Sequence, residues 1–586
     1  MTPPTAPSPE RSTAPSPSRP AESFLDGLYR GRLRWDLMRD FPRQDKADRE
    51  AGDAVLAGFR AFLVDRVDAT AIDRDRRLPD ELVEELRGRG YLRAMLDPAL
   101  GGLGLSAVNT FRLVETAASW SSAVAFTLAI GNGFGAGAYL PLLGDGPLHD
   151  LVHRRIGGGA IGAGADAEPT GTANSLRRTT ATLTADGEGY LLNGEKVFIG
   201  NAPIAELLDV TATVLVDGEP QTQAFFVETD SPGFEVVARH EYMGLGGAPN
   251  GALRLTDVRV PRQHAFAGSN TELRRSRELA EIGYLARTLV VGAPALAIAR
   301  LCLHWSREFV NRRTVDGRSL GDHEEIQRIL GDSLADVFAI ESVADWTLLG
   351  APGADTLFEH VALKNIASLA CWRVVDRTMS LLGGEGFETA VSKARRGADP
   401  LPVERFFRDA RGLRIAGGVD FLLDWFAARG RLAAQDQAPD AGAPDAGAPD
   451  EGADGETGLT GRNLEHLRAA RAAAAELGRQ CRELMDGQPD HARLFARQHL
   501  LITLNRIANE LLAISAVLAR AAAEPGTGLL ADLFCAGARQ RIAALRAELD
   551  GVGEEPDWAA AGAAWLGAEQ WPGLLDDVLT TTPPAR

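Results

Sequence analysis

Apolar residues recur along this chain at two different spacings, and the spacing changes twice. Between residues 24 and 120 they lie three and four positions apart, as in DAVLAGFRAFLVDRV and LPDELVEELRGRGYL, which predicts amphipathic helices. From 160 to 265 apolar and polar residues alternate, with DG and NG turns between the segments, which predicts short antiparallel strands. The helical spacing returns at 272–432 and again at 460–550. Helices, then strands, then helices predict an α+β protein and exclude a Rossmann fold, in which strands and helices alternate.

At 586 residues the chain is too long for one hydrophobic core. The pattern divides it into a disordered tail at 1–22, an N-terminal helical domain at 23–158, a middle antiparallel β domain at 159–268, a helical bundle domain at 269–434, an acidic linker at 435–458 and an extra C-terminal helical domain at 459–586. The tail has Pro, Ser and Thr without an apolar run, and the linker repeats an APDAG unit, so neither can bury a core. We expect the extra domain to pack back on the first helical block.

One stretch resembles a membrane span in length and composition. Residues 120–144, WSSAVAFTLAIGNGFGAGAYLPLLG, carry no charged side chain. The four alternate glycines from Gly131 to Gly137, with Asn132 among them, favour a tightly packed core helix followed by a glycine-rich loop. We therefore expect no stable membrane insertion.

The net charge and the cysteine spacing limit which ligands and sites this protein is expected to have. A net charge of −18 argues against a nucleic acid as ligand. The four cysteines lie far apart and form no CxxC pair, which is typical of reduced thiols in a cytoplasmic protein and predicts neither a disulfide nor a metal site. They are Cys302, Cys371, Cys481 and Cys535. No HExxH, GxSxG or P-loop motif occurs in the sequence.

Several motifs follow one another at consistent spacing. They are DPALGGLGLS, AEPTGT, LNGEKVFIGN, MGLGGAPNGALRLTDVRVP, NRRTVDGRSLGDHEEIQ, LLGGEGF and VERFFRDARGLRI. Together they resemble the acyl-CoA dehydrogenase family. SFLDGLYRGRL near the start and ANELLAISAVLARA near the end are similar to its very-long-chain members, which carry an extra C-terminal helical domain. The resemblance runs from about Phe24 to about Ile542.

The resemblance implies FAD as cofactor, held where the β domain meets the two helical domains. It also implies an acyl thioester of CoA or of a carrier protein as substrate, an electron acceptor that stays unidentified, and a homodimer. In this family the residue at Phe198 shields one flavin face, and the arginine at Arg313 contacts the diphosphate. The positions that match the family's FAD contacts are Asp166, Ala167, Thr172, Phe198, Ile199, Gly200, Arg313, Gly383, Gly384 and Val419.

The sequence departs from the family at its catalytic base. The family's glutamate falls on Gly417, and a second branch places its base at Ala286, directly before Arg287. No catalytic residue is therefore matched. Asp420 is either a substitute base or the cap of the helix that follows. If Gly417 is the reason that the ordinary dehydrogenation is absent, a glutamate at this position is expected to restore some proton abstraction.

The residues at and around the predicted flavin contacts also differ from those that are usual in the family. Ala167 replaces a threonine, Phe198 a tryptophan, Gly200 a threonine or serine, and Val419 a threonine. Residues 388–401 contain an insertion beside the flavin region. The framework motifs are kept, so we interpret these changes as altered function.

Other polar residues have a structural and a functional interpretation. Glu385 is either a solvated loop acid or faces a neighbouring subunit's cofactor, and His240 is either an exposed imidazole or an acid or base. Lys196 is expected in a strand turn with a structural role. Arg408 and Asp409 are expected to form a structural ion pair.

Three functions remain open. The first is an FAD-dependent oxidoreductase that acts on an acyl thioester without the family's base. The second is a flavin oxygenase or oxidase, for which Gly200 and Gly417 would enlarge the space around the flavin. The third is a flavin-free homologue with a binding or non-redox role.

Overall fold

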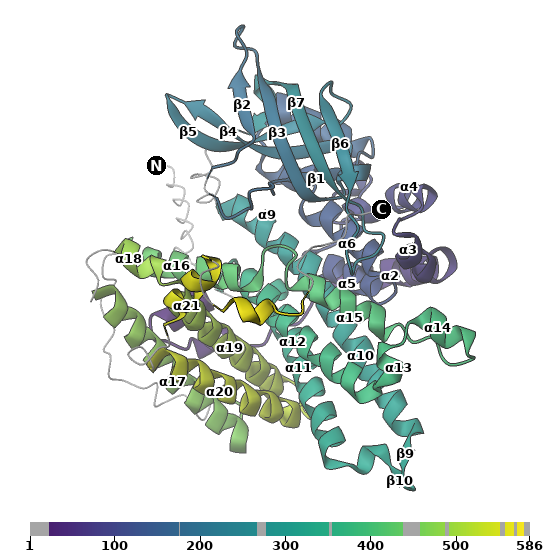
Figure 1. The fold of residues 1–586 in the computed structure, drawn as a ribbon, viewed down its shortest axis with the longest axis vertical. Coiled ribbons are helices and arrows are strands. Elements are labelled where there is room, and N and C mark those ends of the chain that lie inside the picture. The colour runs from purple at the N-terminus through teal and green to yellow at the C-terminus, as the bar shows by residue number, and fades with distance from the viewer. Residues whose placement is uncertain are drawn as a thin grey trace, which may run out of the picture.

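An eight-stranded sheet lies at one end of the molecule, and helices form the rest (Figure 1). The computed structural model describes residues 23–174, 176–266, 277–350, 354–437, 457–486, 491–550, 557–567 and 571–578. The predicted tail at 1–22 and most of the predicted linker lie outside the described residues. The expected α+β class is confirmed, with N-terminal helices, a middle sheet, a helical bundle and added C-terminal helices.

Most of the helices that precede the sheet begin at polar capping residues; α4 and α7 instead follow Pro79 and Gly146. Ser106 accepts a hydrogen bond from the amide of Asn109, and Ser121 accepts one from the amide of Val124. These helices are α1 (Phe24–Tyr29), α2 (Lys46–Arg66), α3 (Ala69–Asp75), α4 (Asp80–Gly88), α5 (Ala107–Ala118), α6 (Ser122–Gly133) and α7 (Pro147–Gly157). α6 is the expected core helix, and almost all of its residues are buried. The glycine-rich part after it is a 3₁₀ helix, Ala136–Leu142, and not a loop.

The middle sheet is mixed, so the expectation of a wholly antiparallel β domain is wrong. Its strands are β1 (Gly162–Ala165), β2 (Thr180–Leu183), β3 (Gly189–Gly200), β4 (Leu207–Val216), β5 (Glu219–Glu228), β6 (Phe234–Arg239), β7 (Asn250–Pro261) and β8 (Ala265–Phe266). Their order is β6-β7-β3-β2-β4-β5-β8, and β1 pairs with β4 off this path. β4 pairs in parallel with both β1 and β2. The alternating pattern predicted the strands, but it holds no information on their relative direction.

Helix α9 leads from the sheet into the bundle, and a π-helical turn follows it (Figure 1). The bundle consists of α9 (Arg277–Arg287), the turn Thr288–Gly292, α10 (Ala293–Arg312), α11 (Glu324–Leu349), α12 (Glu359–Leu382), α13 (Gly384–Phe387), α14 (Ala390–Arg395), α15 (Val403–Leu413) and α16 (Asp420–Gln437). A hairpin of β9 (Thr314–Val315) and β10 (Arg318–Ser319) joins α10 to α11. The insertion forms α14, and its buried Lys393 donates a hydrogen bond to the Glu385 carbonyl at 2.7 Å.

The added C-terminal helices pack on the bundle. They are α17 (Gly461–Asp486), α18 (His491–Ala496), α19 (Gln498–Ala523), α20 (Gly528–Asp550) and α21 (Trp558–Leu566). α19 lies against α11 and α16, and α20 lies against α11. The expectation that this domain packs on the first helical block therefore holds only for α1, and its larger contacts are with the bundle. From that block, α1 packs against α17 and α19, and Arg43 donates to the Ala523 carbonyl at 3.1 Å.

α1 contacts α16 of the bundle and α17 and α19 of the added helices. A Cβ on Gly478 of α17 would collide with Gly31, so the two backbones approach closely just after α1. Glu359 at the start of α12 accepts hydrogen bonds from the Ser23 hydroxyl at 2.8 Å and from the Leu25 amide at 3.1 Å. α1 is thereby held between the bundle and the added helices.

A buried carboxylate joins the bundle to the added helices. Asp424 of α16 accepts hydrogen bonds from the side-chain amides of Asn365, Asn505 and Asn509 at 2.8, 2.8 and 3.1 Å. Burial raises the pKa of Asp424, and the amide donors act in the opposite direction. Three amides directed at one acceptor fix the relative position of α12, α16 and α19.

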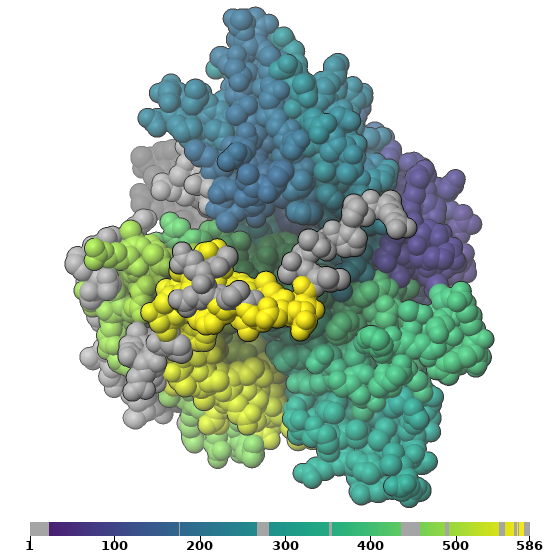
Figure 2. All heavy atoms as spheres, viewed as in Figure 1, coloured from purple at the N-terminus to yellow at the C-terminus, as the bar shows by residue number. Residues whose placement is uncertain are grey.

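Three segments of the described residues are long and apolar enough to cross a membrane: Ser122–Leu142, Ala280–Arg312 and Gln498–Ala523. Most of each segment is buried inside the fold. α21, in contrast, lies on the surface, where Figure 2 shows it in yellow in front of the other helices. The absence of membrane insertion stays a prediction.

Candidate functional site

The loop after β1, the end of α9 and the turn between α15 and α16 meet where the sheet faces the bundle (Figure 1). Arg287 at the end of α9 donates from Nε to the Gly417 carbonyl at 2.8 Å. Its charge also interacts with that of Asp166, the residue after β1. The fold therefore brings three of the motif segments to one junction.

Two ion pairs hold the loop after β1 in place. Asp166 forms a bidentate pair with Arg177, at 2.8 and 2.9 Å, which holds the pKa of this carboxyl below its usual range although burial acts to raise it. Glu168 pairs with Lys196 at 2.9 Å. Lys196 lies within β3 and is fully buried, so its expected position in a turn is wrong. Its contacts are structural, as expected.

Two loop residues with predicted cofactor contacts differ in exposure. The Ala167 carbonyl accepts a hydrogen bond from Val197, which ties the loop to β3. Thr172 lies on the exposed part of the loop. A Cβ on Gly171 beside it would meet no atom within 4 Å. The backbone there is open to an approaching ligand.

Phe198 presents its ring to solvent. Its φ is 60°, an uncommon value for a residue other than glycine, and the side chain is 61% exposed. The ring lies 5.0 Å from that of His240, and the Phe198 amide donates to His240 Nε2 at 3.3 Å. Burial lowers the pKa of His240. His240 is therefore not the lone exposed imidazole expected, because it supports the ring at Phe198.

Ile199 is buried, and Gly200 does not open space for a flavin. A Cβ on Gly200 would lie 3.0 Å from Ile130 and 3.5 Å from Phe126, both in α6. Side chains of α6 therefore occupy the space that a side chain at residue 200 would fill. The expectation that Gly200 enlarges the flavin site is wrong.

The turn at Gly417 contains no helix start. α15 ends at Leu413 and α16 begins at Asp420, and Gly417 and Gly418 have φ of 69° and 109°. A Cβ on Gly417 would lie 3.2 Å from Arg287 Cγ. The arginine side chain therefore takes up the space next to the family's first base position.

The second base position is closed as well. Ala286 is fully buried against α6. A Cβ added to Gly133 of α6 would lie only 2.8 Å from the Cβ of Ala286. A carboxylate at this position would push into α6 and not into the junction.

Asp420 acts as a structural acid. Its carboxylate pairs with Arg414 at 2.7 Å and accepts a hydrogen bond from the Phe421 amide at 2.8 Å. The preceding turn is held by Lys364, whose Nζ donates to the Gly418 carbonyl at 2.7 Å. Val419 is half-buried between these contacts. The geometry favours the capping interpretation of Asp420 over that of a substitute base.

The other predicted cofactor residues lie at the far end of the bundle. α10, with 20 residues, separates Arg313 from the junction, a length of about 30 Å. Gly383 caps α13 and Gly384 begins it near that same end, where Glu385 of α13 pairs with Arg312 and Arg313. One chain does not bring both sets together.

Glu385 pairs with two arginines in this region. Its carboxylate lies 2.6 Å from Arg312 and 3.2 Å from Arg313. This pairing corrects the expectation of a solvated loop acid, and the alternative that Glu385 faces a neighbouring subunit's cofactor stays a prediction. Two cations and one acid leave a positive charge at this end of the bundle.

The expected pair of Arg408 and Asp409 does not form. Arg408 pairs instead with Asp73, at 2.8 Å, and with Glu404, at 2.6 Å. Asp409 accepts a hydrogen bond from the Leu245 amide. Both contacts hold α15 against other elements and are structural.

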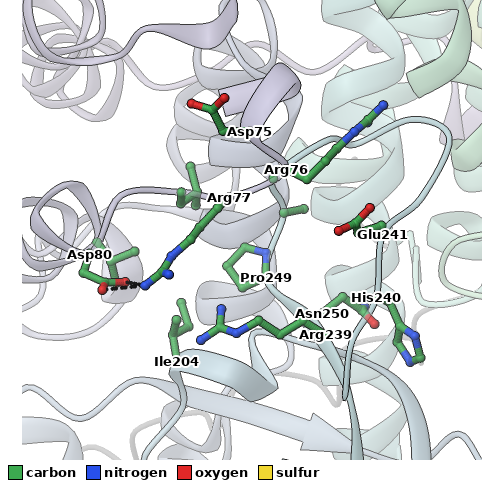
Figure 3. A pocket seen from close by; sticks show the side chains of 14 residues that line it. Asp75, Arg76, Arg77, Asp80, Ile204, Arg239, His240, Glu241, Pro249 and Asn250 are labelled. Carbon is green, nitrogen blue, oxygen red and sulfur yellow. Dashed lines mark hydrogen bonds and ion pairs between the residues drawn. The ribbon is translucent and has the colours of Figure 1, made fainter. Parts of the chain in front are cut away.

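A cavity of about 210 Å³ lies behind His240, between the α3–α4 connection and the segment that joins β6 to β7. Figure 3 shows Arg77 directed at Asp80, and Arg239 extended toward Ile204. Glu241 also lines the space. This cavity could not be predicted from sequence, because its walls come from segments far apart in the chain.

The flavin end of the site fits FAD. Phe198 offers an exposed aromatic face, and the loop after β1 is open at Gly171. At the far end a Cβ on Gly383 or Gly384 would meet no atom within 4 Å, and Arg313 is half exposed. The positive charge there suits a diphosphate, provided that Arg313 exchanges Glu385 for it.

Comparisons with known proteins agree with the motifs. Family models for the acyl-CoA dehydrogenase N-terminal, middle and C-terminal domains match residues 49–145, 163–258 and 285–423. Probable acyl-CoA dehydrogenase FadE10 of Mycobacterium tuberculosis is 31% identical over 418 residues, which are 70% of this chain and 63% of that protein. Benzylmalonyl-CoA dehydrogenase of Aromatoleum aromaticum is 26% identical over 385 residues, 64% of this chain and 96% of that enzyme.

A solved structure also matches over the added helices. An acyl-CoA dehydrogenase of Bacillus anthracis, complexed with FAD, is 19% identical and covers 96% of both chains with a TM-score of 0.72. At this identity the match shows the fold alone. It extends that fold to the C-terminal helices beyond the three matched domains.

Proposed function

The chain belongs to the acyl-CoA dehydrogenase family, and we propose that it is an FAD-dependent oxidoreductase acting on an acyl thioester of CoA or of a carrier protein. The exposed ring of Phe198, supported by His240 and set beside the open loop after β1, is the observation that carries this proposal. Bound FAD would supply two-electron redox chemistry. We place the protein in the cytoplasm, on its reduced and buried cysteines.

The cofactor site takes residues from two subunits in this proposal. Phe198 and the loop after β1 would hold the flavin end, while Arg313, Gly383 and Gly384 of a second copy would hold the diphosphate end. The length of α10 between the two sets supports this arrangement. A homodimer follows from it.

The reaction is atypical in its proton transfer. Among the described residues around Gly417, Asp420 pairs with Arg414 and Asp166 pairs with Arg177, so neither carboxylate is free. Removal of a proton by a protein carboxylate at the family's position is therefore not part of the proposal.

Each of the two alternatives keeps one supporting observation. A flavin oxygenase or oxidase needs no carboxylate at residue 417, although the space expected at Gly200 is filled by Ile130. A flavin-free homologue is supported by the pairing of Arg313 with Glu385.

The visible spectrum of the purified protein tests the proposal. We expect an oxidised-flavin absorption with about one FAD per chain. A colourless protein that takes up no added FAD would leave only the flavin-free homologue. Anaerobic mixing with acyl-CoA then separates the other two functions, since only the oxidoreductase bleaches without an external reductant.

A further inference from the structure

Arg287 carries a positive charge without an anionic partner at the centre of the junction. Its Nε donates to the Gly417 carbonyl at 2.8 Å and its Nη1 to the Gly283 carbonyl at 2.7 Å. No carboxylate lies within ion-pair distance, and Nη2 has no hydrogen bond, within the part of the chain that the structure describes. The guanidinium lies 5.6 Å from the Tyr284 ring and is half-buried.

This state is costly for the protein alone. Burial lowers the pKa of Arg287, which means that the surroundings disfavour the charged form. Buried charges are ordinarily paired with an opposite charge. Of the two positions at which the resemblance places a carboxylate, Gly417 adjoins this side chain, whereas the side chain of Ala286 faces α6.

Two arginines around the junction differ from Arg287 in this respect, whereas the buried Lys364 resembles it in having carbonyl partners. Arg414 pairs with Asp420, and Arg177 pairs with Asp166. Lys364 donates to the carbonyls of Arg414 and Gly418. Asp166 reaches Arg287 only as a distant charge and is already neutralised by Arg177.

The backbone next to Arg287 is also unusual. The helix continues as a π-helical turn from Thr288 to Gly292, a distortion that is frequent at functional sites. The Thr288 hydroxyl lies 2.9 Å from His360 Nδ1, which fixes the first residue of that turn. The guanidinium is thus held in place by its own two carbonyl contacts and by a braced helix end.

We propose that the missing anion arrives on the substrate, and that the site takes an acyl thioester whose acyl chain carries a carboxylate, bound by Arg287. This inference rests on the proposed function, and it names the substrate class of the same site. A guanidinium matches a carboxylate in shape and charge, and its free Nη2 supplies a donor for it. The charge that the family places on a protein glutamate is here placed on the ligand.

Binding of matched ligand pairs to the wild-type protein tests this proposal. Succinyl-CoA is compared with butyryl-CoA, and glutaryl-CoA with pentanoyl-CoA and with its own monomethyl ester, by titration calorimetry. For the acyl length that fits, we expect the acid to bind about 10- to 100-fold more tightly than its neutral match. Equal or tighter binding of the neutral thioesters overturns the inference and leaves the proposed function intact. If no CoA thioester binds, the inference fails for CoA substrates, and the proposed function keeps only thioesters of a carrier protein.

Variants locate the effect at Arg287. In Arg287→Gln the ratio of acid to neutral affinity is expected to fall to about one, while Arg287→Lys keeps part of it. Arg328→Gln is the matched control, because it removes an exposed arginine of α11 and is expected to leave the ratio unchanged. Undiminished binding of the neutral thioester shows that the Arg287→Gln site is still formed. A preserved acid preference in that variant overturns the assignment, and if the variant does not fold, the wild-type pairs decide alone.

Discussion

A side chain at residue 417 has little room in this protein. Its Cβ would lie 3.2 Å from Arg287 Cγ, and the φ of 69° belongs to the left-handed region. Sequence alone suggests that a glutamate at this position would supply the missing base. The geometry indicates that the new side chain meets an arginine, which would hold its carboxylate ionised in an ion pair.

We therefore expect Gly417→Glu to give no gain in flavin bleaching by acyl-CoA. The left-handed backbone and the contact with Arg287 are expected to lower the free energy of unfolding by about 1–3 kcal/mol. Gly430→Glu is the matched control, because Gly430 lies in α16 and a Cβ there meets no atom within 4 Å. Its unfolding free energy is expected to stay the same or rise. Bleaching by the Gly417→Glu protein would show that the junction does accept a base.

Motifs located these residues but not their neighbours. Phe198 and Gly417 could be placed in the site from sequence because their segments have recognisable spacing. That His240 supports Phe198, or that Arg287 fills the space beside Gly417, depends on segments far apart in the chain. Such contacts leave no local pattern, and Gly200 was misjudged for the same reason.

At the scale of elements, the spacing of apolar residues was sufficient to predict which segments are helices, which are strands and in what order they follow. A period of 3.6 residues predicted α2, α4 and α11, and a period of two predicted β3 and β4. The parallel pairing of β4 with β2 and the packing of α19 on α11 and α16 could not be predicted. Both are decided by which surfaces meet once the chain has folded.

The contact of α1 with α12 gives a prediction on pH. Burial raises the pKa of Glu359 from 4.5 to about 7, with the charge of Arg431 acting in the opposite direction. The folded state then binds more protons than the unfolded state between these two values. This carboxyl is therefore most favourable to folding below pH 4.5, and its contribution falls by about 3 kcal/mol as the pH rises through 7.

Glu359→Gln isolates this contribution. The amide mimics the protonated acid and keeps an oxygen to accept from Ser23 and Leu25. The difference in unfolding free energy, variant minus wild type, is expected to rise by up to about 3 kcal/mol between pH 5 and pH 8. Urea unfolding at several pH values measures it. A difference that does not change with pH would show that Glu359 is ionised throughout this range.

For the whole molecule, the proposed cofactor site takes its two sets of residues from two subunits. α10 alone separates them by about 30 Å, and Figure 1 shows the sheet and the β9–β10 hairpin at opposite ends. The added helices cover α11 and α16 within the chain, so these faces are not available for further subunits. Light scattering is therefore expected to show a dimer.

Subunit mixing tests whether one cofactor site is built from both chains. Phe198→Ser removes the flavin end, and Arg313→Ser removes the diphosphate end, so each homodimer is expected to bind FAD weakly. In a heterodimer of the two variants, one site has both defects and the other has neither. Co-expression with two affinity tags should then recover tight FAD binding at about half of the heterodimer's sites, a ratio fixed by the two-fold symmetry. If each site lay within one chain, every site in the heterodimer would keep one defect, and no tight binding would return.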